Sequence, residues 1–147
     1  MSQQSKPQAA ARLLLGLIFF VFGLNGFLHF LPQPPSTPEA MAFGGALAAT
    51  GYMFPLIKGT EVLAGALLLS GRFVPLALTL LAPVVVNILG FHLFLAPKGL
   101  AVPLVALALG LYLAWTEREA YRALFVARRG VATTRAAHTG AHAGAHG

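Results

Sequence analysis

Cysteine is absent from this chain of 147 residues. Without a thiol, the chain forms no disulfide, no thiolate metal site, no iron–sulfur cluster and no covalent c-type haem attachment. Hydrolytic catalysis also lacks support, because no serine lies in a recognisable nucleophile elbow. A redox role therefore requires a bound cofactor that is not covalently attached.

Charged residues are scarce as well. They make up 10% of the chain, whereas 57% is hydrophobic and the mean hydropathy is +0.76. An average soluble domain is about 25% charged, so this composition argues against a soluble globular protein. Several apolar runs approach the roughly 20 residues that a helix needs to cross a bilayer. The sequence therefore predicts an all-α, polytopic membrane protein.

Four apolar stretches predict a bundle of four membrane-spanning helices. They cover about residues 13–31, 54–70, 73–95 and 100–116. Residues 1–12 form a predicted N-terminal segment, residues 13–129 the membrane domain, and residues 130–147 a disordered tail rich in Ala, Gly and His. The basic start also suits a secretory signal peptide, but the length of the first stretch favours an uncleaved span.

The connection between the first two spans has a pattern of its own. Residues 32–38 are rich in proline, which excludes a regular helix and predicts a stiff connector. Thr37, Pro38 and Glu39 then resemble a helix start, with a hydroxyl cap, proline at the first position and an acid in the first turn. Residues 40–50 are too short to span, so we predict an interfacial or re-entrant helix. A flexible loop is the alternative.

Basic residues are distributed unequally between the two sides of the predicted bundle. Four spans place both termini and the turn at Arg72 on one side, opposite Lys98. That side carries Lys6, Arg12, Arg72, Arg118, Arg122, Arg128, Arg129 and Arg135. The positive-inside rule makes this the cytoplasmic side, so the excess charge indicates topology and not nucleic-acid binding. The basic residues 118–135 are predicted to contact the anionic inner leaflet, or alternatively to dock a cytoplasmic enzyme.

Polar residues within the spans are concentrated in the predicted outer half of the bilayer. They are Asn25, His29, Lys58, Glu61, Asn87 and His92. The first two are four residues apart and the next two are three apart, so each of these pairs shares a helix face, whereas Asn87 and His92 do not. Polar groups at this depth usually face the bundle and indicate function. We therefore predict a polar pocket open to the outer face; the alternative is a structural Lys58–Glu61 pair.

Proton transfer is the chemistry that suits this predicted pocket. Glu61 and His29 are the candidate catalytic groups, because carboxyl and imidazole groups exchange protons. The surrounding candidates are Asn25, Lys58, Asn87 and His92, which would hydrogen-bond the carbonyl groups of a quinone. A quinone is lipid-soluble and can enter between helices, so it is the cofactor that we predict.

Three competing chemistries have weaker support. His29 and His92 are the residues available to ligate a haem, which is a sparse signal. A proton-coupled transporter would use a buried carboxylate, but no inverted repeat is evident. Histidines recur every four residues in the tail, at His138, His142 and His146, but the glycines between them disfavour the helix that a metal site there would need. No metal is predicted.

Several motifs resemble the DoxX family of small four-helix bacterial membrane proteins. They are Gly23-Leu24-Asn25-Gly26, Ala48-Ala49-Thr50-Gly51-Tyr52, Lys58-Gly59-Thr60-Glu61-Val62-Leu63-Ala64-Gly65, the stretch from Ala82-Pro83 to Asn87, and Phe91-His92. The resemblance covers about residues 12–126. It implies a bacterial inner-membrane protein that accompanies either a quinone-reducing sulfur oxidoreductase or oxidative-stress enzymes, with Glu61 as the leading residue.

No cofactor motif accompanies this resemblance. We therefore expect a quinone-site or anchoring subunit of an oxidoreductase rather than a complete enzyme. The rival interpretation is a structural or partner-binding membrane protein without its own catalysis. Both interpretations allow a homo-oligomer, because Gly44, Gly45, Gly59 and Gly65 permit close approach of helices.

Overall fold

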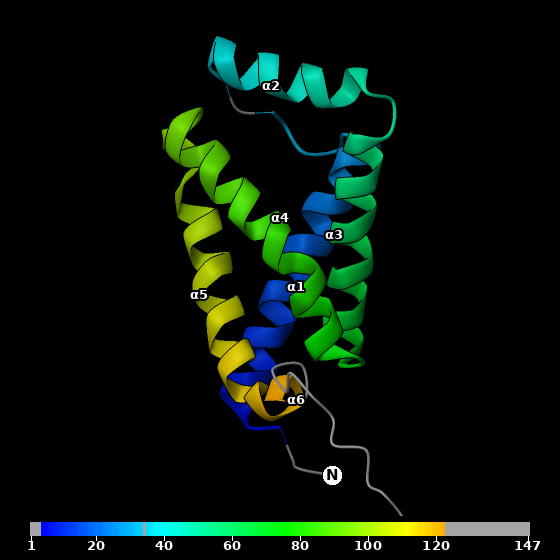
Figure 1. Ribbon diagram of the computed structural model, residues 1–147, viewed down its shortest axis with the longest axis vertical. Helices are drawn as coiled ribbons and strands as arrows, with labels where there is room; N and C mark the ends of the chain where they lie inside the picture. The colour runs from blue at the N-terminus through cyan, green and yellow to red at the C-terminus, as the bar shows by residue number, and fades with distance from the viewer. Residues whose placement is uncertain (1–3, 34, 123–147) are drawn as a thin grey trace, which may run out of the picture.

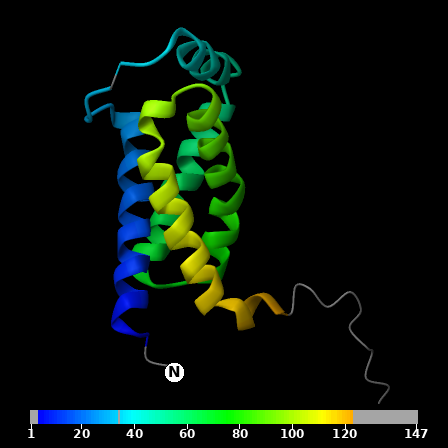
Figure 2. The ribbon, with the colours of Figure 1, turned by 90° about the vertical axis from the view of Figure 1, so that its left-hand side faces the viewer.

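The computed structural model describes residues 4–33 and 35–122, and this part of the chain is helical and without strands. The elements are α1 (Lys6–Leu28), α2 (Pro38–Ala49), α3 (Met53–Ser70), α4 (Val74–Phe94), the 3₁₀ turn η1 (Pro97–Gly99), α5 (Ala101–Thr116) and α6 (Arg118–Arg122). Helices α1, α3, α4 and α5 run along the long axis, and α2 lies across one end (Figures 1 and 2). The all-α prediction is confirmed.

Three of these helices are long and apolar enough to cross a membrane, namely α1, α3 and α4. Helix α5 is equally apolar but has 16 residues, fewer than the roughly 20 that a straight span needs. Large apolar side chains such as Val86, Phe94 and Trp115 point outward. The structure thus supports three candidate spans, and the fourth crossing stays a prediction.

Helix α1 differs at both ends from the predicted span over residues 13–31. It begins at Lys6, because the Ser5 hydroxyl accepts a hydrogen bond from the Gln8 amide and proline follows in the first turn. It ends at Leu28, because His29 takes up the left-handed conformation and Asn25 Oδ1 accepts from the Leu31 amide at 2.7 Å. Residues 6–12 therefore belong to the helix, and residues 29–31 do not.

Helix α2 forms where the cap pattern predicted a helix start. The Thr37 hydroxyl accepts from the Ala40 amide at 3.2 Å, and Pro38 occupies the first turn. The same hydroxyl donates to the Leu95 carbonyl at 2.6 Å, which fastens the start of α2 to the end of α4. The alternative of a flexible loop is therefore wrong, while a location at the membrane interface stays a prediction.

The predicted tight turn between α3 and α4 is present. Gly71 caps α3 with a φ of +70°, a left-handed conformation that glycine adopts without strain. Arg12 reaches over from α1 and donates through Nη1 to the carbonyls of Leu68 and Leu69. The guanidinium thus gives two carbonyl groups in the last turn of α3 a charged donor, at the end of the helix that favours positive charge.

Further polar contacts join the helices at this same end. Gln8 donates to the side chains of Thr116 and Glu117, both at 3.2 Å, and the Tyr121 hydroxyl donates to the Pro75 carbonyl at 2.9 Å. Burial raises the pKa of Tyr121, which favours the protonated hydroxyl that donates this hydrogen bond. The chain turns at Glu117, so α5 and α6 are separate helices.

Most of the described basic residues lie at one end of the bundle, while the orientation of the chain in a membrane stays a prediction. The start of α1, the α3–α4 turn and α6 lie at one end, which we call the basic end, and α2 lies at the other (Figure 1). The basic end carries Lys6, Arg12, Arg72, Arg118 and Arg122. Residues 123–147, including Arg128, Arg129, Arg135 and the predicted disordered tail with its three histidines, lie outside the described residues.

Candidate functional site

Helices α1 and α3 form the most extensive interface in the described bundle. Glycines allow their backbones to touch: a Cβ atom on Gly65 would lie 2.5 Å from the Phe20 amide nitrogen, and one on Gly23 would lie 2.9 Å from the Val62 nitrogen. A Cβ atom on Gly16 would lie 3.0 Å from the Leu68 Cβ and 3.0 Å from the Leu69 nitrogen. Close approach through small residues is a usual mode of helix packing in membranes.

The ion pair between Lys58 and Glu61 lies on α3 beside this interface. Lys58 Nζ is 2.9 Å from Oε2 and 3.1 Å from Oε1 of Glu61. The Glu61 side chain is 2% exposed and that of Lys58 23%, so the carboxylate is enclosed while the lysine reaches the surface. The prediction that these residues share a face is confirmed.

Two glycines of α1 make room for this pair. A Cβ atom on Gly26 would lie 2.5 Å from Cγ and Cδ of Lys58, and one on Gly23 would lie 3.0 Å from the Glu61 Cβ. Sequence reasoning found the pair but missed this role of α1. The spacing of Gly16, Gly23 and Gly26, seven and then three residues apart, was the available signal, because it aligns them on one helix face.

Asn25 and His29 lie at the C-terminal end of α1 and do not have the roles predicted for them in a polar pocket. Asn25 is buried, but its Oδ1 accepts from the Leu31 amide, so it caps the end of its own helix. His29 is exposed and lies beyond the helix at the cap position. The prediction that His29 lies on the helix of the first span is therefore wrong, because α1 ends at Leu28.

The two candidates on α4 face different ways, as their five-residue spacing predicted. The Nδ1 atom of His92 donates to the Ile88 carbonyl at 2.9 Å, since a carbonyl can only accept. Its ring lies against Gly99 of η1 and meets Phe91 edge-on at 5.1 Å. Asn87 lies instead on an exposed face of the helix. The six predicted residues thus do not meet in one pocket.

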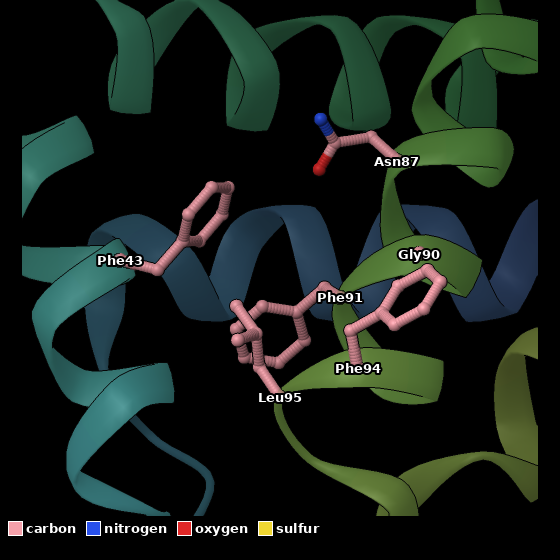
Figure 3. A pocket seen from close by; sticks show the side chains of 6 residues that line it. All are labelled: Phe43, Asn87, Gly90, Phe91, Phe94 and Leu95. Atoms are coloured by element: carbon pink, nitrogen blue, oxygen red, sulfur yellow. The ribbon is translucent and has the colours of Figure 1, made fainter.

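A cleft of about 320 Å³ lies between α2 and α4, where Asn87 faces Phe43 (Figure 3). It is open to one side and mostly apolar. Its lining consists of Phe43, Asn87, Gly90, Phe91, Phe94 and Leu95. The rings of Phe43 and Phe91 lie 5.7 Å apart and bring the two helices together at its edge. The sequence did not predict this cleft, because it depends on how α2 folds back over α4.

Metal ligands do not gather in residues 4–33 and 35–122, where no group of three or more His, Asp or Glu side chains could hold an ion. His29 and His92 are accounted for separately, one exposed at the end of α1 and the other packed on η1. The structure therefore adds no support for a haem held between them.

Comparison with known proteins finds no match among family models, curated proteins or solved structures. The resemblance to the DoxX family therefore stays a prediction that depends on the quoted motifs.

Proposed function

We propose that this chain is a DoxX-like integral membrane protein that acts as a quinone-associated subunit of a membrane oxidoreductase system. The observation that carries the proposal is the Lys58–Glu61 pair, whose carboxylate is enclosed between two apolar helices. An ionised side chain at mid-bilayer costs roughly 2.5–3.5 kcal/mol on insertion scales. Such groups usually serve a function.

The proposed chemistry follows from what the pair can do. A quinone takes up two electrons and two protons on becoming a quinol, and the electrons come here from a partner oxidoreductase. The Lys58 ammonium group donates a hydrogen bond to the Glu61 carboxylate at 2.9 Å, so a proton can move between the two groups. Because Lys58 is partly exposed and Glu61 is enclosed, the pair can pass a proton inward from the surface.

The proposed setting is the bacterial inner membrane, with both termini in the cytoplasm. Helix α5 is the fourth span in this proposal, and α2 lies at the outer interface. The apolar side chains that α1, α3, α4 and α5 turn outward support the bilayer as the surroundings of the bundle. The basic end supports the orientation, because positively charged loops stay in the cytoplasm.

A second candidate function is that of a structural or partner-anchoring membrane protein. The hydrogen bonds within the Lys58–Glu61 pair favour it, because a mutually satisfied pair can simply join helices. Open surface at Gly44, Gly45 and Gly59 also leaves room for a second copy or another subunit, since a Cβ atom there meets nothing within 4 Å. Gly65, by contrast, packs against α1 of the same chain.

Mass spectrometry of lipids extracted from the purified protein separates the two functions. We expect stoichiometric quinone in the wild type and a clear reduction in Glu61→Gln. Glu39→Gln is the matched control, because it makes the same change at an exposed position on α2. A double variant, Lys58→Gln with Glu61→Gln, removes both charges and so leaves no lone ammonium group if the single variant is unstable.

Each of the two candidate functions predicts a different quinone content. Quinone that is lost in the Glu61 variants while circular dichroism shows a folded protein supports the redox function. Wild-type protein without quinone overturns it and favours the structural or anchoring function, for which co-purifying proteins are then the relevant measurement.

A further inference from the structure

Charge is unbalanced at the basic end of the bundle. Its described residues include five basic and two acidic side chains, whereas the rest of the described chain carries two of each sign. Two of the basic groups share Glu119, which lies 2.9 Å from Arg122 Nη1 and 4.0 Å from Arg118 Nε. Arg72 makes no ion pair with any residue in 4–33 and 35–122. A surface with this excess of positive charge attracts an anionic partner.

Two of these arginines lie against exposed aromatic rings. Arg72 Cζ is 6.0 Å from the centre of the Phe73 ring, and Arg118 Cζ is 5.3 Å from that of Trp115. The two rings are 64% and 69% exposed. A guanidinium group that stacks on a ring keeps N–H groups at its edge with which it binds a phosphate. Basic and aromatic side chains together are typical of the headgroup region of a bilayer, whereas a soluble anion would leave the rings in water.

The backbone of Phe73 adds an observation that does not depend on charge. Its φ of +54° lies in the left-handed region, which is strained for a bulky side chain. Gly71, two residues earlier, has a φ of +70° without strain. Packing inside the bundle does not offset the strain at Phe73, because its ring is exposed. Burial of the ring among lipid chains does offset it, since the transfer of an aromatic side chain out of water is favourable.

A hydrogen bond joins the two arginine–aromatic pairs. The Tyr121 hydroxyl of α6 donates to the Pro75 carbonyl in the first turn of α4 at 2.9 Å. Arg72 lies three residues before Pro75, and Arg118 lies three residues before Tyr121. Helix α6 and the α3–α4 turn therefore present their arginines at the same end of the bundle (Figure 1). The sequence predicted contact with the anionic leaflet for residues 118–135, and the structure adds the turn to this surface.

We propose that the α3–α4 turn and α6 bind an anionic phospholipid of the leaflet at the basic end. Arg72 and Arg118 donate to the headgroup, while the rings of Phe73 and Trp115 lie among the first carbons of the lipid chains. This site goes beyond the proposed function, because it requires neither a quinone nor a redox partner and depends only on the chain lying in a bilayer.

The test measures lipid preference directly. The full chain is purified in detergent and mixed with equal amounts of phosphatidylglycerol, which is anionic, and phosphatidylcholine, which has a phosphate but no net charge. Native mass spectrometry then gives the ratio of the two lipids bound per chain. The variants are Arg72→Gln, Arg118→Gln and both together. Lys98→Gln is the matched control, because it removes one positive charge from an exposed residue at the opposite end.

We expect the wild type to prefer phosphatidylglycerol. The preference should fall about fivefold for each arginine removed, the change that corresponds to about 1 kcal/mol. Lys98→Gln should match the wild type. Phe73→Gly separates lipid binding from folding, because glycine relieves the strained backbone while removing the ring. Its melting temperature in detergent without lipid should equal or exceed that of the wild type, although it binds less phosphatidylglycerol.

Three results would overturn this site. The first is a double arginine variant that keeps the full preference, and the second is an equal loss in Lys98→Gln, which would show that only net charge matters. The third is a wild type without any preference, including one that instead retains a cytoplasmic protein through Arg72 and Arg118. None of these results bears on the quinone content, so the proposed function is tested separately.

Discussion

The α1–α3 interface and the α2–α4 interface are built in opposite ways. Across the first, glycines bring two backbones into contact, and Arg12 of α1 closes the end of α3. Across the second, the Thr37–Leu95 hydrogen bond and the Phe43–Phe91 ring contact hold the helices at one edge of a cleft. The closed interface defines the bundle, whereas the open one has space for a ligand.

Gly65→Ala should have the largest effect, because it disrupts the closed interface between α1 and α3. Its Cβ atom would lie 2.5 Å from backbone nitrogen of Phe20, so α1 and α3 must separate. We expect a loss of about 2 kcal/mol in unfolding free energy. Gly59→Ala is the same change on the same helix in open space, and it should stabilise the protein by up to about 1 kcal/mol.

Thermal unfolding in detergent, followed by circular dichroism, measures both alanine variants. Opposite signs of the two shifts in melting temperature support the closed interface. Equal shifts would show that α1 and α3 do not touch at Gly65.

Arg12→Ala tests the same interface at the basic end. The carbonyls of Leu68 and Leu69 would lose a charged donor, and hydrogen bonds to charged groups contribute about 1.5–3 kcal/mol. Arg72→Ala removes the same charge from an exposed residue of the neighbouring turn, and it should change stability by less than about 0.5 kcal/mol. Chemical denaturation of both variants gives the comparison, and similar losses would contradict a specific cap.

Thr37→Val should have the smallest effect on the whole protein, because it acts on the open interface. It removes the hydroxyl that caps α2 and bonds Leu95, with an expected local loss of about 1 kcal/mol. Hydrogen–deuterium exchange should rise over α2 while α1 and α3 stay protected. Thr37→Ser retains the hydroxyl and should exchange like the wild type; faster exchange in both variants would mean that the methyl group, not the hydroxyl, holds α2.

Much of the helical architecture could be predicted, because it depends on local signals. The lengths of the apolar runs predicted the long helices and the turn at Arg72 between α3 and α4, and Thr37 with Pro38 predicted the start of α2. The ends of α1 were missed for a physical reason. Ser5 and Asn25 are polar residues flanking or inside an apolar run, and only the capping hydrogen bonds reveal that they set its limits.

The candidate site could be predicted only in part. The Lys58–Glu61 pair follows from a three-residue spacing within one helix, and the structure confirms it. Whether Asn25, His29 and His92 converge depends on which face each helix turns toward the bundle. Helices that are apolar on every face carry no sequence signal for that orientation. The α2–α4 cleft depends on contacts between segments far apart in the chain, for which the sequence carries no periodic signal.

The contact of Arg12 with Leu68 and Leu69 has a consequence for biosynthesis. The carbonyls that accept from Arg12 are synthesised 56 and 57 residues after it. The glycine interface between α1 and α3 involves no residue beyond Ser70. The α1–α3 hairpin, with α2 in its loop, can therefore form before α4 is synthesised, and its core is then completed by residues of α4 and α5. Helix α4 then packs against α3 and completes the cleft with α2, whose lining ends at Leu95, and α5 packs last, against α1 and α4.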